Sequence, residues 1–143
     1  MRYGRTITLD GPFEHVQRDV RQALADQGFG VLTEIDVQAT LKAKLDQDIE
    51  PYLILGACNP PLAHRALGVD RSVGLLLPCN VVVRGDGDRV IVEVIDPDTM
   101  VTLTGLDAMA PVAEEAGRRL DAALSSLVGH VTGPGRSSSA PPG

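Results

Sequence analysis

The sequence predicts an α+β domain in which an antiparallel sheet carries two long helices, with shorter helices on the same face. Two segments, Phe13–Gln27 and Leu106–Leu127, repeat apolar residues at helical spacing. Short apolar runs bounded by turn residues lie between them, as expected for strands. The dipeptide Asp86-Gly87 is typical of a two-residue hairpin turn, which joins antiparallel strands. Helices gathered on one face of an antiparallel sheet define the α+β class.

The N-terminal third predicts two strands around the first long helix. Arg2–Leu9 alternates loosely between polar and apolar residues and predicts a strand near a sheet edge. A helix starts after Asp10, because Pro12 is tolerated in a first turn, and it ends at Gly28. Phe29–Ile35 predicts the second strand.

The middle of the chain predicts shorter elements. Asp36 is expected to cap a helix that ends near Leu45, and Pro51–Ala57 predicts the third strand. A two-turn helix follows, with Asn59 as its cap, two prolines in its first turn and Gly68 at its end.

The last strands and the C-terminal helix follow the same reasoning. Val73–Val83 is apolar on both alternating faces and predicts a fourth strand, interrupted at Pro78 because proline donates no ladder hydrogen bond. Val90–Ile95 predicts the strand that returns from the hairpin, and Asp96–Leu103 predicts a short capped turn before the long helix. We expect residues 1–128 to form a single domain and residues 129–143, rich in Gly, Ser and Pro, to form a disordered tail.

Composition argues against several function classes. The net charge is −6, and only two Phe, two Tyr and no Trp are present. Nucleic-acid binding uses clustered cations and aromatic stacking surfaces, so we expect no nucleic-acid partner. No apolar run approaches the ~20 residues that span a bilayer, and no signal peptide is evident. We therefore expect a cytoplasmic protein without a membrane partner, whose two cysteines stay reduced.

Both alternating faces of the predicted fourth strand are apolar, yet the helices are expected to cover only one sheet face. Contiguous apolar patches of several hundred Å² are rare on monomers. A second subunit would cover the remaining face, and we therefore expect a homodimer.

The residues most able to carry chemistry are two cysteines, each followed by asparagine at a proline-marked break. Cys58 and Asn59 lie in "ACNP", and Cys79 and Asn80 lie in "LPCN". Cys58 precedes the helix cap, where first-turn N–H groups favour an anion and lower a thiol pKa. If the two strands pair, the thiols approach each other as packed side chains, a redox pair or two metal ligands. Free cysteines are most often small buried apolar residues, so packed thiols are the expectation.

A metal site needs more ligands than these. Cys58, His64 and Cys79 would supply three tetrahedral positions, but zinc sites usually contain ligands two to four residues apart, which this chain lacks. His64 is expected on the solvated side of its helix. We therefore expect no metal and no other cofactor.

The runs "LGACNPPLAHRAL" and "LLPCNVVV", in this order, resemble the domain-of-unknown-function family 302 (DUF 302), over nearly the whole chain except the tail. The resemblance implies a TBP-like β-α-β4-α fold and a homodimer. The family's motif positions correspond here to Gly56, Cys58, Asn59, Pro60, Pro78, Cys79 and Asn80. It implies no established reaction.

Two functions from different classes remain open. The first is a module that binds a small molecule or an anion in a pocket near Cys58, Asn59, Cys79 and Asn80. The second is a thiol-dependent redox or sulfur-transfer enzyme, with Cys58 as nucleophile and Cys79 as its resolving partner. A purely structural dimer with both cysteines in the core is the third possibility. The binding module is favoured because the sequence offers no second catalytic group.

Overall fold

The computed structural model describes residues 3–130, and five strands and two long helices lie within them, joined by shorter helical segments. The elements in chain order are β1 (Gly4–Asp10), α1 (Phe13–Asp26), β2 (Gly30–Asp36), α2 (Val37–Leu45), β3 (Tyr52–Cys58), α3 (Pro60–Val69), η1 (Arg71–Leu76), β4 (Cys79–Asp86), β5 (Arg89–Ile95), α4 (Asp98–Thr104), η2 (Asp107–Met109) and α5 (Ala110–His130). This order confirms the predicted α+β class. Residues 131–143 of the predicted tail lie outside the described residues.

The strands form one antiparallel sheet in the order β1-β5-β4-β3-β2. The predicted hairpin joins β4 to β5, with Asp86 paired to Arg89 and two residues between them. Gly87, the first of those two, has a φ of +65°, which explains why glycine occupies the turn. β1 lies at a sheet edge, as its loose alternation predicted.

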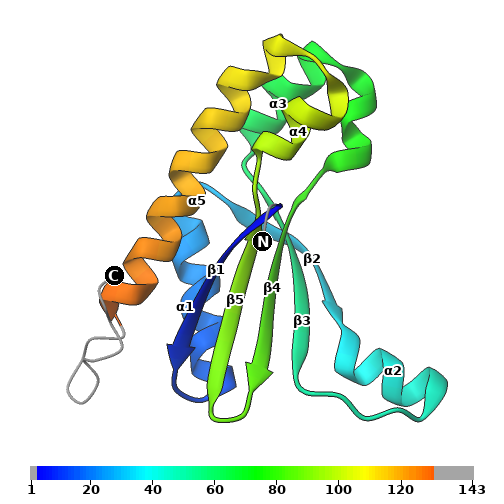
Figure 1. Cartoon of the computed structure of the whole chain (residues 1–143), viewed down its shortest axis with the longest axis vertical. Helices are drawn as coiled ribbons and strands as arrows, with labels where there is room; N and C mark the ends of the chain where they lie inside the picture. The colour runs from blue at the N-terminus through cyan, green and yellow to red at the C-terminus, as the bar shows by residue number, and fades with distance from the viewer. Residues whose placement is uncertain (1–2, 131–143) are drawn as a thin grey trace.

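Helices α1 and α5 cover one face of the sheet, and α1 is visible behind the strands in Figure 1. Alternate strand residues point into this layer and are buried, among them Leu55, Val81, Val83 and Val92. A second buried cluster lies beyond the ends of the strands, where α3, η1 and α4 pack against the first half of α5. It includes Leu62, Ala66, Val73, Met100, Met109 and Ala116.

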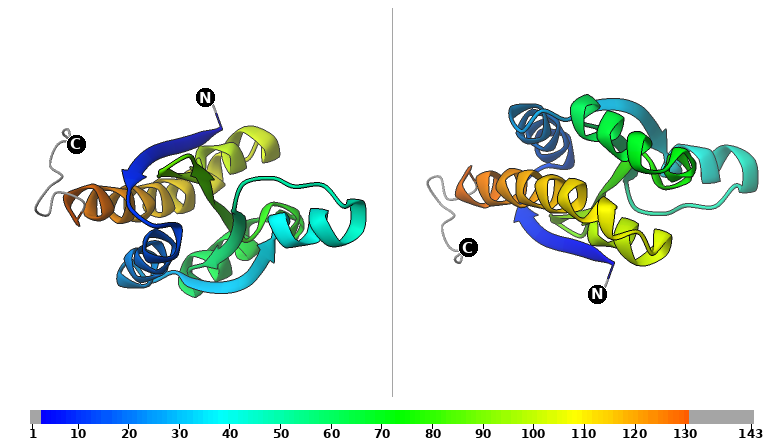
Figure 2. Two further views of the ribbon diagram at one scale, coloured as in Figure 1. Left: turned by 90° about the horizontal axis from the view of Figure 1, so that it is seen from below. Right: turned by 90° about the horizontal axis from the view of Figure 1, so that it is seen from above.

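The opposite sheet face, called the open face below, keeps apolar side chains partly exposed. It carries the alternate strand residues Tyr52, Ile54, Val82, Ile91 and Ile95, all of intermediate burial. Helix α2 extends away from the rest of the molecule beside β3 (Figures 1 and 2), and none of its residues is buried.

Two sequence predictions were wrong near the cysteines. The strand expected over Val73–Val83 begins only at Cys79, because Arg71–Leu76 forms a 3-10 helix capped by the Asp70 side chain. The short turn expected over Asp96–Leu103 is instead extended into helix α4, which Gly105 ends with a φ of +70°.

Candidate functional site

A pocket of about 210 Å³ opens where β3 ends and β4 begins, between α3, α4 and α5. Cys58 and Cys79 both line it. Most of the remaining wall is carbon, supplied by Phe29, Ala57, Leu62 and other apolar side chains. The sequence predicted a pocket near the two breaks, and this pocket lies there.

Strand pairing brings the two cysteines to this pocket. β3 and β4 are neighbours, and Ala57 lies directly opposite Cys79, so Cys58 is one residue from that pair. Both cysteines are free and half-buried. They are therefore two separate thiols on the wall of one pocket.

The environment of Cys79 favours the neutral thiol. Burial raises its pKa to about 11, and the negative charge that Cys58 would carry as a thiolate adds to this effect. Cys79 is therefore protonated at neutral pH.

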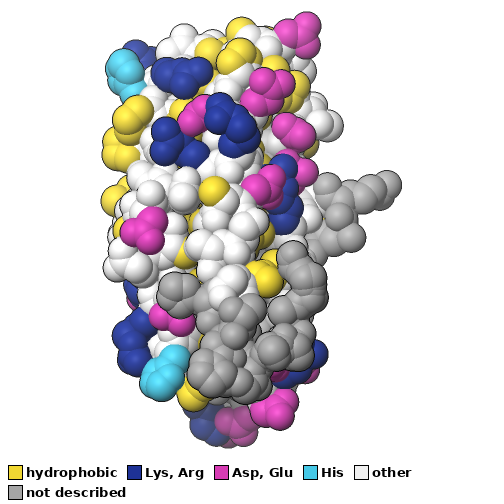
Figure 3. Space-filling view, turned by 90° about the vertical axis from the view of Figure 1, so that its left-hand side faces the viewer, with side chains coloured by type: hydrophobic (Ala, Val, Ile, Leu, Met, Phe, Trp, Pro, Cys, Tyr) yellow, Lys and Arg dark blue, Asp and Glu magenta, His cyan; other side chains and the backbone are white. Residues whose placement is uncertain are grey.

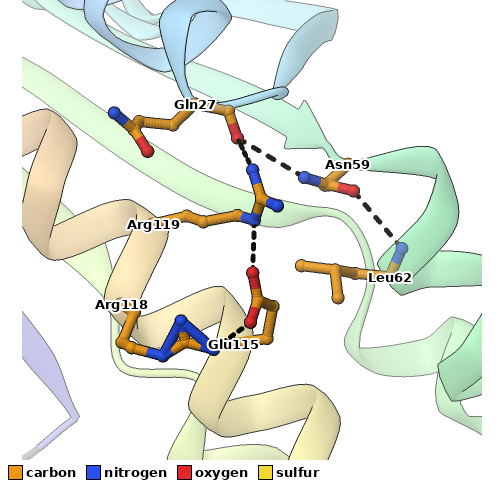
Figure 4. A network of polar contacts seen from close by, with 6 residues as sticks. All are labelled: Gln27, Asn59, Leu62, Glu115, Arg118 and Arg119. Carbon is orange, nitrogen blue, oxygen red and sulfur yellow. Dashed lines mark hydrogen bonds and ion pairs between the residues drawn. The ribbon is translucent and has the colours of Figure 1, made fainter.

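Among the residues that the structure describes, Asn59 is the one buried polar side chain, 7% exposed, and it acts as a structural bridge. Its Oδ1 accepts a hydrogen bond from the Leu62 N–H at 3.3 Å, which caps α3 as predicted, and its Nδ2 donates to the Gln27 carbonyl at 3.5 Å. Arg119 donates to the same carbonyl at 3.1 Å and to Glu115 at 2.7 Å. Figure 4 shows that this network ties α3 to the end of α1 and to α5.

The N–H groups of the first turn of α3 are not available to an anion. Pro60 and Pro61 occupy the first two positions and have no N–H. The Leu62 N–H is bonded to the Asn59 side chain, and the Ala63 N–H is bonded to the Asn59 carbonyl at 2.9 Å. The donors on which the expected thiolate or anion site depended are thus absent or engaged, so that part of the expectation lacks support here.

Gly56 allows the chain to close tightly beside the pocket. A β-carbon at this position would lie 2.2 Å from Thr33 Oγ1 and 2.8 Å from Pro78 Cγ. Both distances are shorter than real contacts, so only glycine lets β2 and the Pro78 segment approach β3 this closely. This contact was not predicted from the sequence, although a glycine inside an apolar run is the signal that points to it.

The other predicted site residues lie elsewhere. Asn80 is exposed and lines a different groove, on the open face, together with Tyr52, Arg84 and Glu93. His64 is exposed on α3. Among residues 3–130, no three His, Cys, Asp or Glu side chains gather where they could hold a metal ion, so the weak candidate set of Cys58, His64 and Cys79 does not assemble.

Sequence reasoning missed several residues of the pocket. Met100, on α4, and Ala116, on α5, line it from positions far along the chain. Arg119 reaches the Gln27 carbonyl across 92 residues. No local pattern points to these residues, because Met100 and Ala116 reach the pocket, and Arg119 reaches the Gln27 carbonyl, only through the packing of α4 and α5.

The exposed surface has mixed charge on the side that α5 occupies. Lys and Arg lie next to Asp and Glu there rather than in a patch of one sign (Figure 3). Glu115, for example, contacts Arg118 and Arg119. In the described part of the chain, no helix is long and apolar enough to cross a membrane.

Comparison with known proteins identifies a family and a solved structure of similar fold. The model of the family described as domain of unknown function DUF302 matches residues 5–127. A crystal structure described as an uncharacterized conserved protein DUF302 from Bacillus stearothermophilus is similar, with 27% sequence identity and a TM-score of 0.82. The similarity covers 89% of this chain and 99% of the other. A search of curated proteins finds no match.

Proposed function

The chain belongs to the DUF302 family, and from this premise we propose that the domain is a binding module that holds a small, mostly apolar molecule in the pocket beside Cys58 and Cys79. The observation that carries the proposal is the pocket itself. Two thiols and a largely carbon wall meet in a space of about 210 Å³ at the edge of the core. Ligand sites are typically concave, mainly apolar and supplied with few polar groups.

The pocket chemistry narrows the ligand class. Asn59 uses its amide in the cap and the Gln27 contact, and α3 offers no unused first-turn N–H group. An anion would lose its hydration without gaining donors, which is unfavourable. An uncharged ligand of fragment size fits this wall better.

Titration with indole tests the proposal, because indole is uncharged, flat and small. We expect its addition to shift backbone amide resonances at the end of β3, the start of β4 and the start of α3. Ala63→Leu should weaken these shifts by filling the pocket, since Ala63 lines it. Ala25→Leu, at an exposed position on α1, is the matched control. Shifts that are absent, or equally large in Ala63→Leu, would refute the proposal.

We further propose that the domain is a homodimer that pairs through the open face. That face keeps Tyr52, Ile54 and Val82 partly exposed, and Ile35 beside them is 50% exposed. A nine-residue helix is marginal alone in water, and α2 buries none of its residues within the subunit, so a partner would stabilise it.

Light scattering coupled to gel filtration measures the oligomeric state. We expect a dimer for the wild type and a monomer for Ile35→Lys, because an introduced ammonium would be desolvated at the interface. Ala122→Lys, exposed on α5, should leave the dimer intact. A wild-type monomer at micromolar concentration would refute this part.

The thiol-dependent reaction stays a second candidate because both cysteines line one pocket. Alkylation of each thiol as a function of pH separates the candidates. An apparent pKa at Cys58 well under the usual ~8.5 favours the enzyme. Two inert thiols would exclude it.

A further inference from the structure

We propose that the sulfur atoms of Cys58, Cys79 and Met100 form a binding site for a soft monovalent metal ion, Cu(I), in the pocket. The three residues come from β3, β4 and α4 and line the same space of about 210 Å³. Their sequence positions give no ligand motif, and the fold alone gathers them.

The sulfur donors of Cys58, Cys79 and Met100 favour a soft metal ion. Thiolate and thioether sulfurs favour Cu(I), whereas carboxylates and carbonyls favour Mg²⁺ or Ca²⁺. Within residues 3–130, no carboxylate and no imidazole lines this pocket. Cu(I) accepts two or three ligands, so it does not need the fourth group whose absence argues against a structural zinc site.

The surroundings also suit a metal ion of low charge. Apolar side chains such as Phe29, Leu62 and Ala116 line the pocket together with Cys58, Cys79 and Met100. One thiolate neutralises the charge of Cu(I) and two leave a single negative charge, so the net charge of the filled site stays at or below one unit in an apolar environment. Binding releases each coordinating thiol's proton to solvent and leaves the oxidation state of the metal unchanged.

Met100 has a counterpart in the same cluster that serves as an internal control. Met100 is 5% exposed and Met109 is 0% exposed, and both pack in the cluster beneath α3. Only Met100 lines the pocket. Replacing methionine by leucine conserves volume and usually costs less than about 1.5 kcal/mol, so both variants should fold.

The test uses the full chain, reduced and kept without oxygen, titrated with Cu(I) supplied as its acetonitrile complex. Competition with the coloured chelator bathocuproine disulfonate reports affinity, and X-ray absorption reports the atoms bound to copper. We expect one Cu(I) per chain with only sulfur neighbours. Met100→Leu should lower the affinity roughly tenfold or more, as even partners beyond the first ligand shell cost 10- to 100-fold. Met109→Leu should match the wild type.

Cys58→Ser and Cys79→Ser should each lower the affinity further than Met100→Leu, with circular dichroism showing that each variant folds. If one serine variant does not fold, the other and the methionine pair still decide. Absence of binding, nitrogen or oxygen neighbours, or equal affinities for the two methionine variants would overturn the proposal. The inference does not depend on the proposed apolar ligand: failed indole binding refutes that function alone, and failed copper binding refutes only this site.

Discussion

Gly56→Ala tests the packing beside the pocket, because it adds a single carbon atom at a position whose neighbours are known. The new β-carbon would meet Thr33 Oγ1 at 2.2 Å and Pro78 Cγ at 2.8 Å. Thr33 can relieve the first contact by rotating its side chain. Pro78 has a closed ring beside Cys79 and can yield only if the backbone moves.

The expected cost follows from these two contacts. Overpacking typically lowers the free energy of unfolding by about 1–3 kcal/mol. A β-carbon at position 56 would overlap both the Thr33 side chain and the Pro78 ring, so we expect a loss in the upper part of that range. With a urea slope of about 1–3 kcal/mol per molar, the unfolding midpoint should fall by roughly 1 M.

The control is Gly30→Ala, on the neighbouring strand β2. A β-carbon at Gly30 meets nothing within 4 Å, and its φ is not in the left-handed region. Alanine should therefore leave stability unchanged or raise it by about 0.4–1 kcal/mol, through the unfolded chain. The difference between the two variants isolates the close contact from the general effect of replacing glycine.

A double-mutant cycle with Thr33→Ala apportions the strain. Removing Oγ1 should recover part of the loss, with a coupling of about 0.5–3 kcal/mol, and the Pro78 contact should keep the double variant less stable than Thr33→Ala alone. If Gly56→Ala is as stable as Gly30→Ala, the tight packing of β2, β3 and Pro78 is wrong.

Three further predictions concern the surrounding network. Asn59→Ala should lower the free energy of unfolding by about 1–3 kcal/mol, because it leaves the buried Leu62 N–H unpaired. Asp36→Ala removes the exposed cap of α2 and should lower it by only about 0.5–1 kcal/mol. Equal losses for the two variants in urea denaturation would contradict this prediction. The raised pKa of Cys79 means that the folded state keeps the neutral thiol, so stability is fully present below pH 9 and declines as pH rises toward about 11. This alkaline decline should be smaller in Cys79→Ala, and identical pH profiles would refute it. The hydrogen bond from Arg119 lowers the pKa of Glu115, so the contribution of the Glu115 carboxylate to stability is present above the ordinary carboxyl pKa and is lost as pH falls. In Glu115→Gln, the melting temperature should therefore fall less steeply on the acid side of its pH profile. An unchanged acid side would contradict this prediction.

The helix caps and the hairpin turn were predictable because each depends on residues close together in the sequence. The Asn59 cap, the Asp36 cap and the hairpin at Gly87 each depend on residues within three positions, and the structure confirms all three. Strand pairing then placed Cys58 near Cys79, as the repeated cysteine-asparagine pattern suggested.

The sequence did not predict features that depend on contacts between residues far apart in the chain. Arg71–Leu76 has the composition of a strand, yet the Asp70 cap and the proline at 78 leave it as a 3-10 helix with Leu75 88% exposed. Asn80 follows Cys79 in sequence, but the alternation of side chains along a strand directs it to the opposite face. Met100 joined the pocket through helix packing, for which a single sequence carries no signal.

The pairing of β1 with β5 has a consequence for how this chain is made. Gly4 is opposite Ile95, so β1 has no partner in this sheet until β5, the last of the five described strands, has been synthesised. The apolar face of the sheet is fully covered only when Leu120 and Leu127 of α5 pack against it. A nascent chain that ends at Ile95 would hold all five strands of the described residues but only α1 to cover their apolar face, and the part of that face left uncovered favours aggregation. The domain therefore completes its fold only after α5 has been synthesised, and the same helix completes the wall of the pocket.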